Sequence, residues 1–152
     1  MNTTRRLGDI DMVPFIEQQI YQDVYATLSP VAPVEGGNRK LFAVQAPAVE
    51  VSPWLAPPYI VYRLQTDAAD RGYQTDVVIQ TVLAVNIVAL TTDDIAMYGT
   101  AVYTALNGRQ VVDVTPQFHR IRYQWLATQP LFGAAPFLSV QLYRVLVSVS
   151  VL

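Results

Sequence analysis

The sequence predicts an α+β domain in which an antiparallel β-sheet of about four to five strands carries two α-helices on one face. The first observation is a long stretch at residues 76–90 that is rich in β-branched residues and contains no Gly or Pro. The second is a pair of segments, one on each side of this stretch, with apolar residues at helical spacing. The third is an alternation of apolar and polar residues after residue 118, which is typical of strands.

The predicted central strand is the stretch at residues 76–90, DVVIQTVLAVNIVAL. Its odd-numbered positions are mostly apolar, whereas its even-numbered positions mix Val and Leu with Gln80 and Asn86. One face is therefore expected to be buried and the other to be half covered. An open sheet in a monomer rarely has this pattern.

The chain begins with an expected arm at residues 1–13, which has no periodicity and would be ordered by a neighbouring molecule. The single α+β domain is expected to span residues 14–152, a length that suffices for one hydrophobic core. Its first element is a helix that starts at Pro14 and ends near Ser29. Apolar residues recur at every fourth position of this helix: Ile16, Ile20, Val24 and Leu28.

Pro and Gly residues punctuate residues 30–58, which predicts a long Pro-rich loop with a short extended piece at residues 40–45. Trp54 and Leu55 are large apolar residues within this loop. They either fold over the core or anchor a partner, because Trp is frequent among binding hot spots. Both residues are therefore candidate interface residues.

The next predicted strand, residues 58–64, leads through a polar hairpin loop at residues 67–74 into the central strand. The tip of this hairpin is too polar to belong to the core. We therefore expect Asp70, Arg71 and Tyr73 to contact a neighbouring subunit or a partner protein on which the subunits assemble.

A second helix is expected to start after Thr91, because a threonine caps a helix N-terminus and carboxylates favour the positive end of the helix dipole. Asp93 and Asp94 are adjacent and point to different sides of this helix, so they suit capping better than paired catalysis. An Asn-Gly pair at residues 107–108 is expected to end the helix. The apolar stripe between these ends comprises Ile95, Tyr98, Val102 and Leu106.

The remaining predicted strands are residues 111–114, 118–128 and 138–152. His119 has no Ser, Cys or second His placed to work with it, so no catalytic role is expected. An apolar loop at residues 129–137 contains Leu131, Phe132 and Phe137. Two phenylalanines left in water would each forfeit roughly 1.5–3 kcal/mol of burial. The loop therefore either folds onto its own domain or is buried by a partner, and we favour the partner.

The composition excludes several classes of function. Charged residues make up 14% of the chain and hydrophobic residues 52%, so surplus apolar surface is expected to enter subunit contacts. The longest apolar run is well short of the roughly 20 residues that a membrane-spanning helix needs. The absence of Cys and the single His exclude disulfides, thiolate sites and multi-histidine metal clusters. The ten basic residues are scattered along the sequence and the net charge is −2, so no basic cluster for binding nucleic acid is expected.

Several segments together resemble the tail terminator, or tail completion, proteins of long-tailed bacteriophages. They are the block PPYIVYRLQTD at residues 57–67, the following hairpin, the long strand with Gln80 and Val85, and a helix that begins TTDD and ends ALNG. The resemblance runs over most of residues 14–152. It implies a structural virion protein without enzymatic activity. Such a protein forms a ring, usually a hexamer, on the head-proximal end of the tail tube, stops tube polymerisation and provides the interface for head or neck joining.

The same resemblance implies the partners: further copies of the chain in a homo-hexameric ring, the tail tube protein and a head–tail connector or neck protein. DNA would pass through the lumen without sequence-specific binding, and assembly in the host cytoplasm would place the protein in the virion. No cofactor, metal or membrane is expected. Another neck or head-completion component, or a cellular oligomeric binding module, are the alternative functions. The candidate interface residues are Trp54, Leu55, Asp70, Arg71, Tyr73, Leu131, Phe132 and Phe137.

Overall fold

The computed structural model describes residues 17–43, 56–65, 69–70, 76–112, 118–131 and 135–150. A first helix spans residues 17–28. The further elements are η1 (Ser29–Val31), β1 (Val34–Glu35), β2 (Asn38–Arg39), β3 (Leu41–Ala43), β4 (Tyr59–Leu64), β5 (Ala69–Asp70), β6 (Asp76–Ala89), α2 (Thr92–Leu106), β7 (Gln110–Val112), β8 (Phe118–Leu131) and β9 (Phe137–Ser150). The expected arm at residues 1–13 lies outside the described residues, as do Trp54, Leu55, Arg71, Tyr73 and Phe132.

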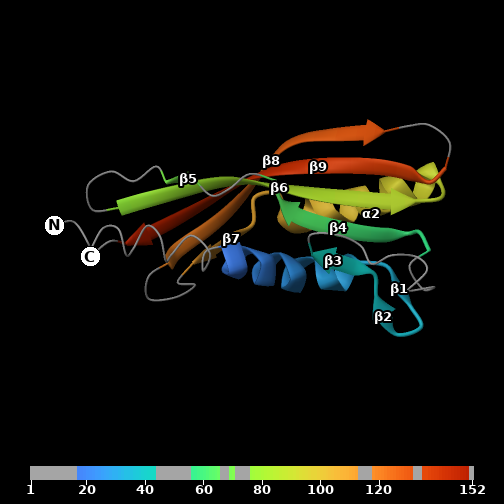
Figure 1. Cartoon of the computed structure of the whole chain (residues 1–152), viewed down its shortest axis with the longest axis horizontal. Helices are drawn as coiled ribbons and strands as arrows, with labels where there is room; N and C mark the ends of the chain where they lie inside the picture. Colours follow the sequence, from blue (N-terminus) through green and yellow to red (C-terminus); the bar gives the residue numbers. More distant parts are fainter. Residues whose placement is uncertain are drawn as a thin grey trace.

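The main sheet contains six strands in the order β3-β4-β6-β9-β8-β7, and the short β5 pairs with β6 beside this path (Figure 1). The α+β class is confirmed, but the prediction of an antiparallel sheet of four to five strands is wrong. The sheet is mixed because β3 runs parallel to β4, while the other neighbouring pairs are antiparallel. The connection at residues 44–58 is long enough for this reversal, since a parallel pair needs about a dozen residues or more between its strands.

The strand β6 occupies the centre of this sheet, as predicted, between β4 and β9 and antiparallel to both. Its side chains on the helix side are fully buried at Leu83, Val85 and Ile87. On the other face, Val82 and Val88 are half-buried. The predicted pattern of one buried and one half-covered face is therefore confirmed in the part of β6 whose side chains are described.

The first helix and α2 lie on the same side of the sheet, as predicted (Figure 1). The core forms between the two helices and the sheet, and the first helix contributes Ile20, Val24 and Leu28 to it. Val102 and Leu106 of α2 are also fully buried, and the sheet supplies two tyrosines and several aliphatic residues. Neither described helix combines the length and the apolar character needed to cross a membrane.

The ends of α2 have the capping groups that the sequence predicts. At the N-terminus, the Thr91 hydroxyl accepts a hydrogen bond from the backbone N–H of Asp94 at 3.1 Å. After the C-terminus, Gly108 has a φ of 78°, a conformation that favours glycine. The backbone N–H of Gly108 donates a hydrogen bond to the Tyr123 carbonyl oxygen on β8, and the backbone N–H of Trp125 donates to the Asn107 side-chain oxygen. These two bonds connect the turn to the sheet.

The middle of α2 approaches the sheet closely at Gly99. The side-chain amide of Gln141, on β9, donates a hydrogen bond to the Gly99 carbonyl oxygen at 2.8 Å. The Tyr143 hydroxyl in turn donates to the Gln141 side-chain oxygen at 2.5 Å. A Cβ atom at Gly99 would lie 3.3 Å from the Gln141 amide nitrogen, so glycine permits the helix to sit this near to β9.

Candidate interaction surface

Three of the eight interface candidates fall within the described residues: Asp70, Leu131 and Phe137. Asp70 ends β5, whereas Leu131 ends β8 and Phe137 begins β9. The last two lie at the same end of the sheet, because Leu131 pairs with Leu138, the neighbour of Phe137. The structure therefore places Leu131 and Phe137 at the same end of the sheet and leaves Asp70 in a different part of it.

The predicted hairpin loop at residues 67–74 is partly strand. Ala69 and Asp70 form β5 and pair with Gln80 and Ile79 of β6, so the polar segment extends the edge that β4 begins. A strand of two residues is too short to produce a periodic pattern in the sequence. The hairpin between β4 and β6 itself is confirmed by their antiparallel register, in which Leu64 pairs with Leu83.

The predicted apolar loop at residues 129–137 is also shorter than expected. Its first three residues continue β8 and pair with β9, so Gln129 and Pro130 are strand residues. This end of β8 is tolerant of proline because β7 pairs with β8 only at Arg120 to Arg122, which leaves the far end as a free edge. Phe137 is half-buried and pairs with Ala89 at the end of β6.

A cluster around Asp23 joins the first helix to β8. Both carboxylate oxygens of Asp23 accept hydrogen bonds from the Arg109 guanidinium, at 2.7 and 3.2 Å, and the Tyr123 hydroxyl donates to the same carboxylate at 2.7 Å. The hydrogen bond to Asp23 raises the pKa of Arg109, and burial followed by the Asp23 charge raises the pKa of Tyr123. Because both oxygens are occupied by donors, this carboxylate is poorly placed to accept a substrate proton. We interpret the cluster as a structural connection.

A shallow, open hollow of about 590 Å³ lies over the first helix and is lined by Glu17, Gln18, Tyr21, Gln22, Tyr25 and Tyr62. Burial and then the nearby Tyr25 and Tyr21 raise the pKa of Tyr62 to about 12, so its hydroxyl stays neutral at physiological pH. The lining of this hollow combines tyrosines and amides with one glutamate and contains no nucleophile paired with a base. Among the described residues, no group of three or more His, Cys, Asp or Glu side chains is arranged to hold a metal ion.

A further candidate surface is the sheet face opposite the two helices, which we call the open face. No described helix or strand packs over it (Figure 1). Its centre is mostly apolar: Val82, Val88, Val140, Leu142 and Leu146 are half-buried, Ala84 is buried, and Asn86 is the half-buried polar residue among them. A half-covered apolar sheet face of this kind is typical of a protein interaction surface.

Four arginines cross the open face. Arg63 lies on β4, Arg144 on β9, and Arg120 and Arg122 on β8. The strand registers place them on a diagonal across the sheet. Arg63 is level with Leu142 of β9, Arg144 lies two residues further along β9, and Arg122 is level with Leu146, another two residues along. With ~3.3 Å per residue and ~4.8 Å between strands, successive arginines are roughly 7–12 Å apart.

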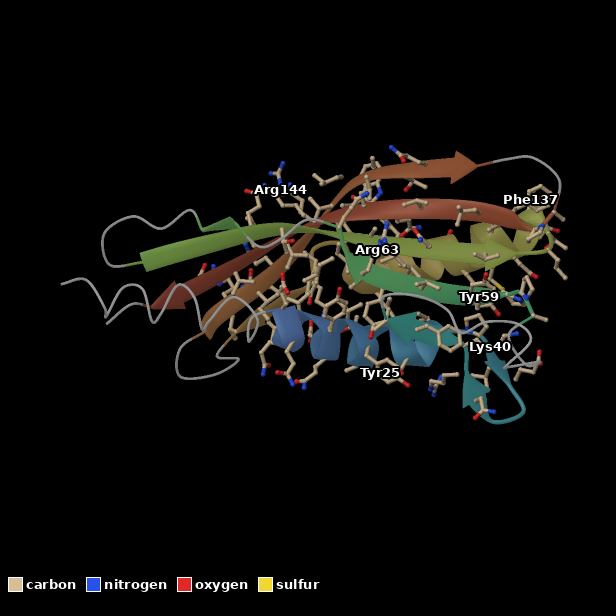
Figure 2. All side chains as sticks on the ribbon, in the orientation of Figure 1. Tyr25, Lys40, Tyr59, Arg63, Phe137 and Arg144 are labelled. Carbon is tan, nitrogen blue, oxygen red and sulfur yellow. The ribbon has the colours of Figure 1, made fainter. Side chains whose placement is uncertain are left out.

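These arginines lack partners within the described part of the chain. None of the four forms an ion pair there, and the buried Arg144 Nε atom has no hydrogen-bond acceptor. Arg144 projects on the opposite side of the sheet from Tyr25 of the first helix (Figure 2). No carboxylate is present among the open-face side chains that the structure describes. Among the described residues, the open face therefore combines apolar area with positive charge that no described carboxylate offsets.

The arginine diagonal corrects the expectation that basic residues are scattered without a cluster. They are scattered along the sequence, but the register of three strands brings four of the ten onto one face. The alternation of Arg120 and Arg122 with apolar neighbours indicated a solvent-exposed face, but only for the strand that contains them, β8. Pairing between distant strands, which no local pattern reports, was needed to find the rest.

The fold is similar to that of a chain in a solved structure described as "Virion of native gene transfer agent (GTA) particle". The TM-score is 0.51 and the identity 16%, and the match covers 88% of this chain and 90% of that chain. No family model matches the sequence, and no curated protein matches it. At this identity, the likeness establishes a shared fold.

Proposed function

We propose that this protein is a structural component of a phage-like virion, and more specifically a tail terminator. In this role it forms a homo-hexameric ring on the head-proximal end of the tail tube, stops polymerisation of the tube and receives the neck. The single observation that carries the proposal is the fold shared, over nearly the whole of both chains, with a chain of a gene transfer agent virion. The sequence resemblance to tail terminators supports the finer assignment.

The described surface supports an assembly role. A ring of identical subunits joined by rotation uses two different surfaces of each subunit. The open face provides an apolar and basic surface for such contacts, and the end of the sheet at Leu131 and Phe137 provides another. Leu90, which follows β6 at that same end, is 53% exposed. We assign this apolar end to neck docking, together with Trp54, and the hairpin at Asp70 to contacts with the tube or a neighbouring subunit.

The test is to produce the chain together with the tail tube protein of the same particle and to image the tubes by electron microscopy. We expect a ring at one end of each tube and a narrow distribution of tube lengths. Tubes made without the chain should grow to variable lengths. Unchanged lengths and bare tube ends would overturn the proposed function, whatever the purified chain does by itself.

A further inference from the structure

The outer surface of α2 is unusual for a helix that faces solvent. Such a surface normally carries several charged residues of both signs, but α2 contains no Lys or Arg, and its only charged residues are Asp93 and Asp94 in the first turn. Met97 is 54% exposed and Tyr103 is 41% exposed. The remaining outward residues are small or uncharged: Ala96, Thr100 and Thr104. The surface therefore has apolar area and, at one end, negative charge.

The open face and the outer surface of α2 are complementary in chemistry. The open face combines half-buried Val and Leu residues with four arginines that have no ion-pair partner among the described residues, and the α2 surface combines Met97 and small residues with Asp93 at its N-terminal end. Arg paired with apolar neighbours is typical of the buried centre of protein interfaces. In the described part of the chain, the buried Arg144 Nε donor also has no acceptor, which a carboxylate from outside would supply.

The two surfaces cannot meet within one molecule, because they lie on opposite sides of the same two-layer domain. The helices cover one face of the sheet, and the outer surface of α2 points away from it. A contact between them must therefore join two copies. Such a contact is heterologous, since it uses a different surface of each partner, and heterologous contacts produce rings when the rotation closes.

We propose that the open face of one copy is covered by the outer surface of α2 from a second copy, with Asp93, at the N-terminal end of that surface, placed against the arginine diagonal. The neighbour's helix then supplies a third layer on a face that no described element covers. The length of α2 is about 22 Å at 1.5 Å per residue, comparable to the ~20 Å between Arg63 and Arg122 along the diagonal. This inference deepens the proposed function and rests on it for the ring geometry.

Disulfide trapping tests the contact directly, because the chain has no cysteine of its own. Met97→Cys marks the α2 surface and Leu142→Cys marks the open face. When the two variants are mixed under mild oxidation, we expect a covalent dimer that contains one of each, in at least several-fold excess over either homodimer. Val34→Cys replaces Met97→Cys in the control, since Val34 is exposed on β1 and belongs to neither surface; it should give no such excess.

A charge exchange provides the second measurement. The double variant Arg122→Glu with Arg144→Glu and the double variant Asp93→Arg with Asp94→Arg should each lose self-association in sedimentation analysis, while circular dichroism shows that both are folded. Mixing the two should restore assemblies, because the two variants can then alternate: one kind of contact pairs Glu on the open face with Arg on α2, and the other is the wild-type contact. Arg39→Glu, on β2 and outside both surfaces, should leave association unchanged.

Each other outcome has a defined meaning. Equal trapping of the control, folded charge variants that keep the wild-type mass, or a mixture that stays dissociated would overturn the proposed contact. Arginine-dependent binding of duplex DNA without the mixed disulfide would assign the open face to a polyanion instead. Rings on tail tubes without the mixed disulfide would overturn this contact and leave the proposed function standing.

Discussion

At the scale of single residues, Asp23 makes the connection with the largest number of partners in the described part of the chain. It lies on the first helix, whereas Arg109 follows α2 and Tyr123 lies on β8, so one carboxylate joins three elements that are distant in sequence. Tyr123 is almost fully buried, and its hydroxyl has Asp23 as its acceptor. A buried hydroxyl that loses its acceptor costs roughly 1–3 kcal/mol.

We therefore expect Asp23→Ala to lower the free energy of unfolding by about 1–3 kcal/mol in urea titrations. Tyr123→Phe should cost less, and the double variant should cost less than the sum, because the two groups share one interaction. Gln18→Ala, exposed on the same helix, is the matched control and should stay within about 0.5 kcal/mol of the wild type. Equal stability of the Asp23 and Gln18 variants would show that the cluster contributes nothing.

At the scale of elements, α2 is held through its inner surface and its ends. Val102 and Leu106 enter the core, Gly99 lets the helix contact Gln141, and Thr91 caps its first turn. On the outer surface, Tyr103 accepts a hydrogen bond from the Asn107 amide and packs edge-on against Trp125, so among the described contacts this surface is tied to β8 only near its C-terminal end. The Thr91 cap is therefore expected to stabilise the first turn of α2, which carries Asp93 and Asp94, by a measurable free energy.

Thr91→Ala should lower the free energy of unfolding by about 1 kcal/mol, because the backbone N–H of Asp94 loses its side-chain acceptor. The adjacent Thr92→Ala is the control, since Thr92 is exposed and makes no capping bond; its effect should stay within about 0.5 kcal/mol. Chemical denaturation of both variants measures the difference. Indistinguishable losses would mean that the cap is not a stabilising contact.

At the scale of the whole molecule, the core contains tyrosines whose ionisation opposes folding. Burial raises the pKa of Tyr62 from 10.0 to about 12, and it also raises the pKa of Tyr123 and Tyr143. The folded state thus keeps protons that the unfolded state releases above pH 10.0. The contribution of these tyrosines to the free energy of unfolding is therefore fully present below the unfolded pKa and is lost as pH rises toward the folded pKa.

We therefore expect the free energy of unfolding to decline as pH rises from 10.0 toward about 12, the window set by Tyr62. Tyr62→Phe should make this decline shallower, because one of the groups that release a proton on unfolding is removed. Ile60→Val, at a buried position on the same strand and without a titrating group, is the control and should lower stability without changing the slope. Urea titrations at a series of alkaline pH values measure it, and identical slopes for Tyr62→Phe and wild type would contradict the prediction.

The sequence by itself determined the elements whose evidence is local. The i+4 spacing of Ile20, Val24 and Leu28 predicts the first helix, the Thr91 cap and Gly108 delimit α2, and the β-branched run at residues 76–90 identifies the central strand, because each depends on the side chains of one short segment. The same patterns predicted which side of β6 is buried. They also predicted two helices on one face.

Only the tertiary structure decided what depends on pairing between segments that are distant in sequence. The parallel approach of β3 to β4, the short strand β5 and the extension of β8 through Pro130 arise from neighbouring strands that supply hydrogen bonds. The same holds for the Asp23 cluster and for the open face, where the registers of β4, β9 and β8 align Arg63, Arg144 and Arg122. A strand's own sequence fixes which residues alternate, but the register that sets their neighbours is chosen by the packing of the complete sheet.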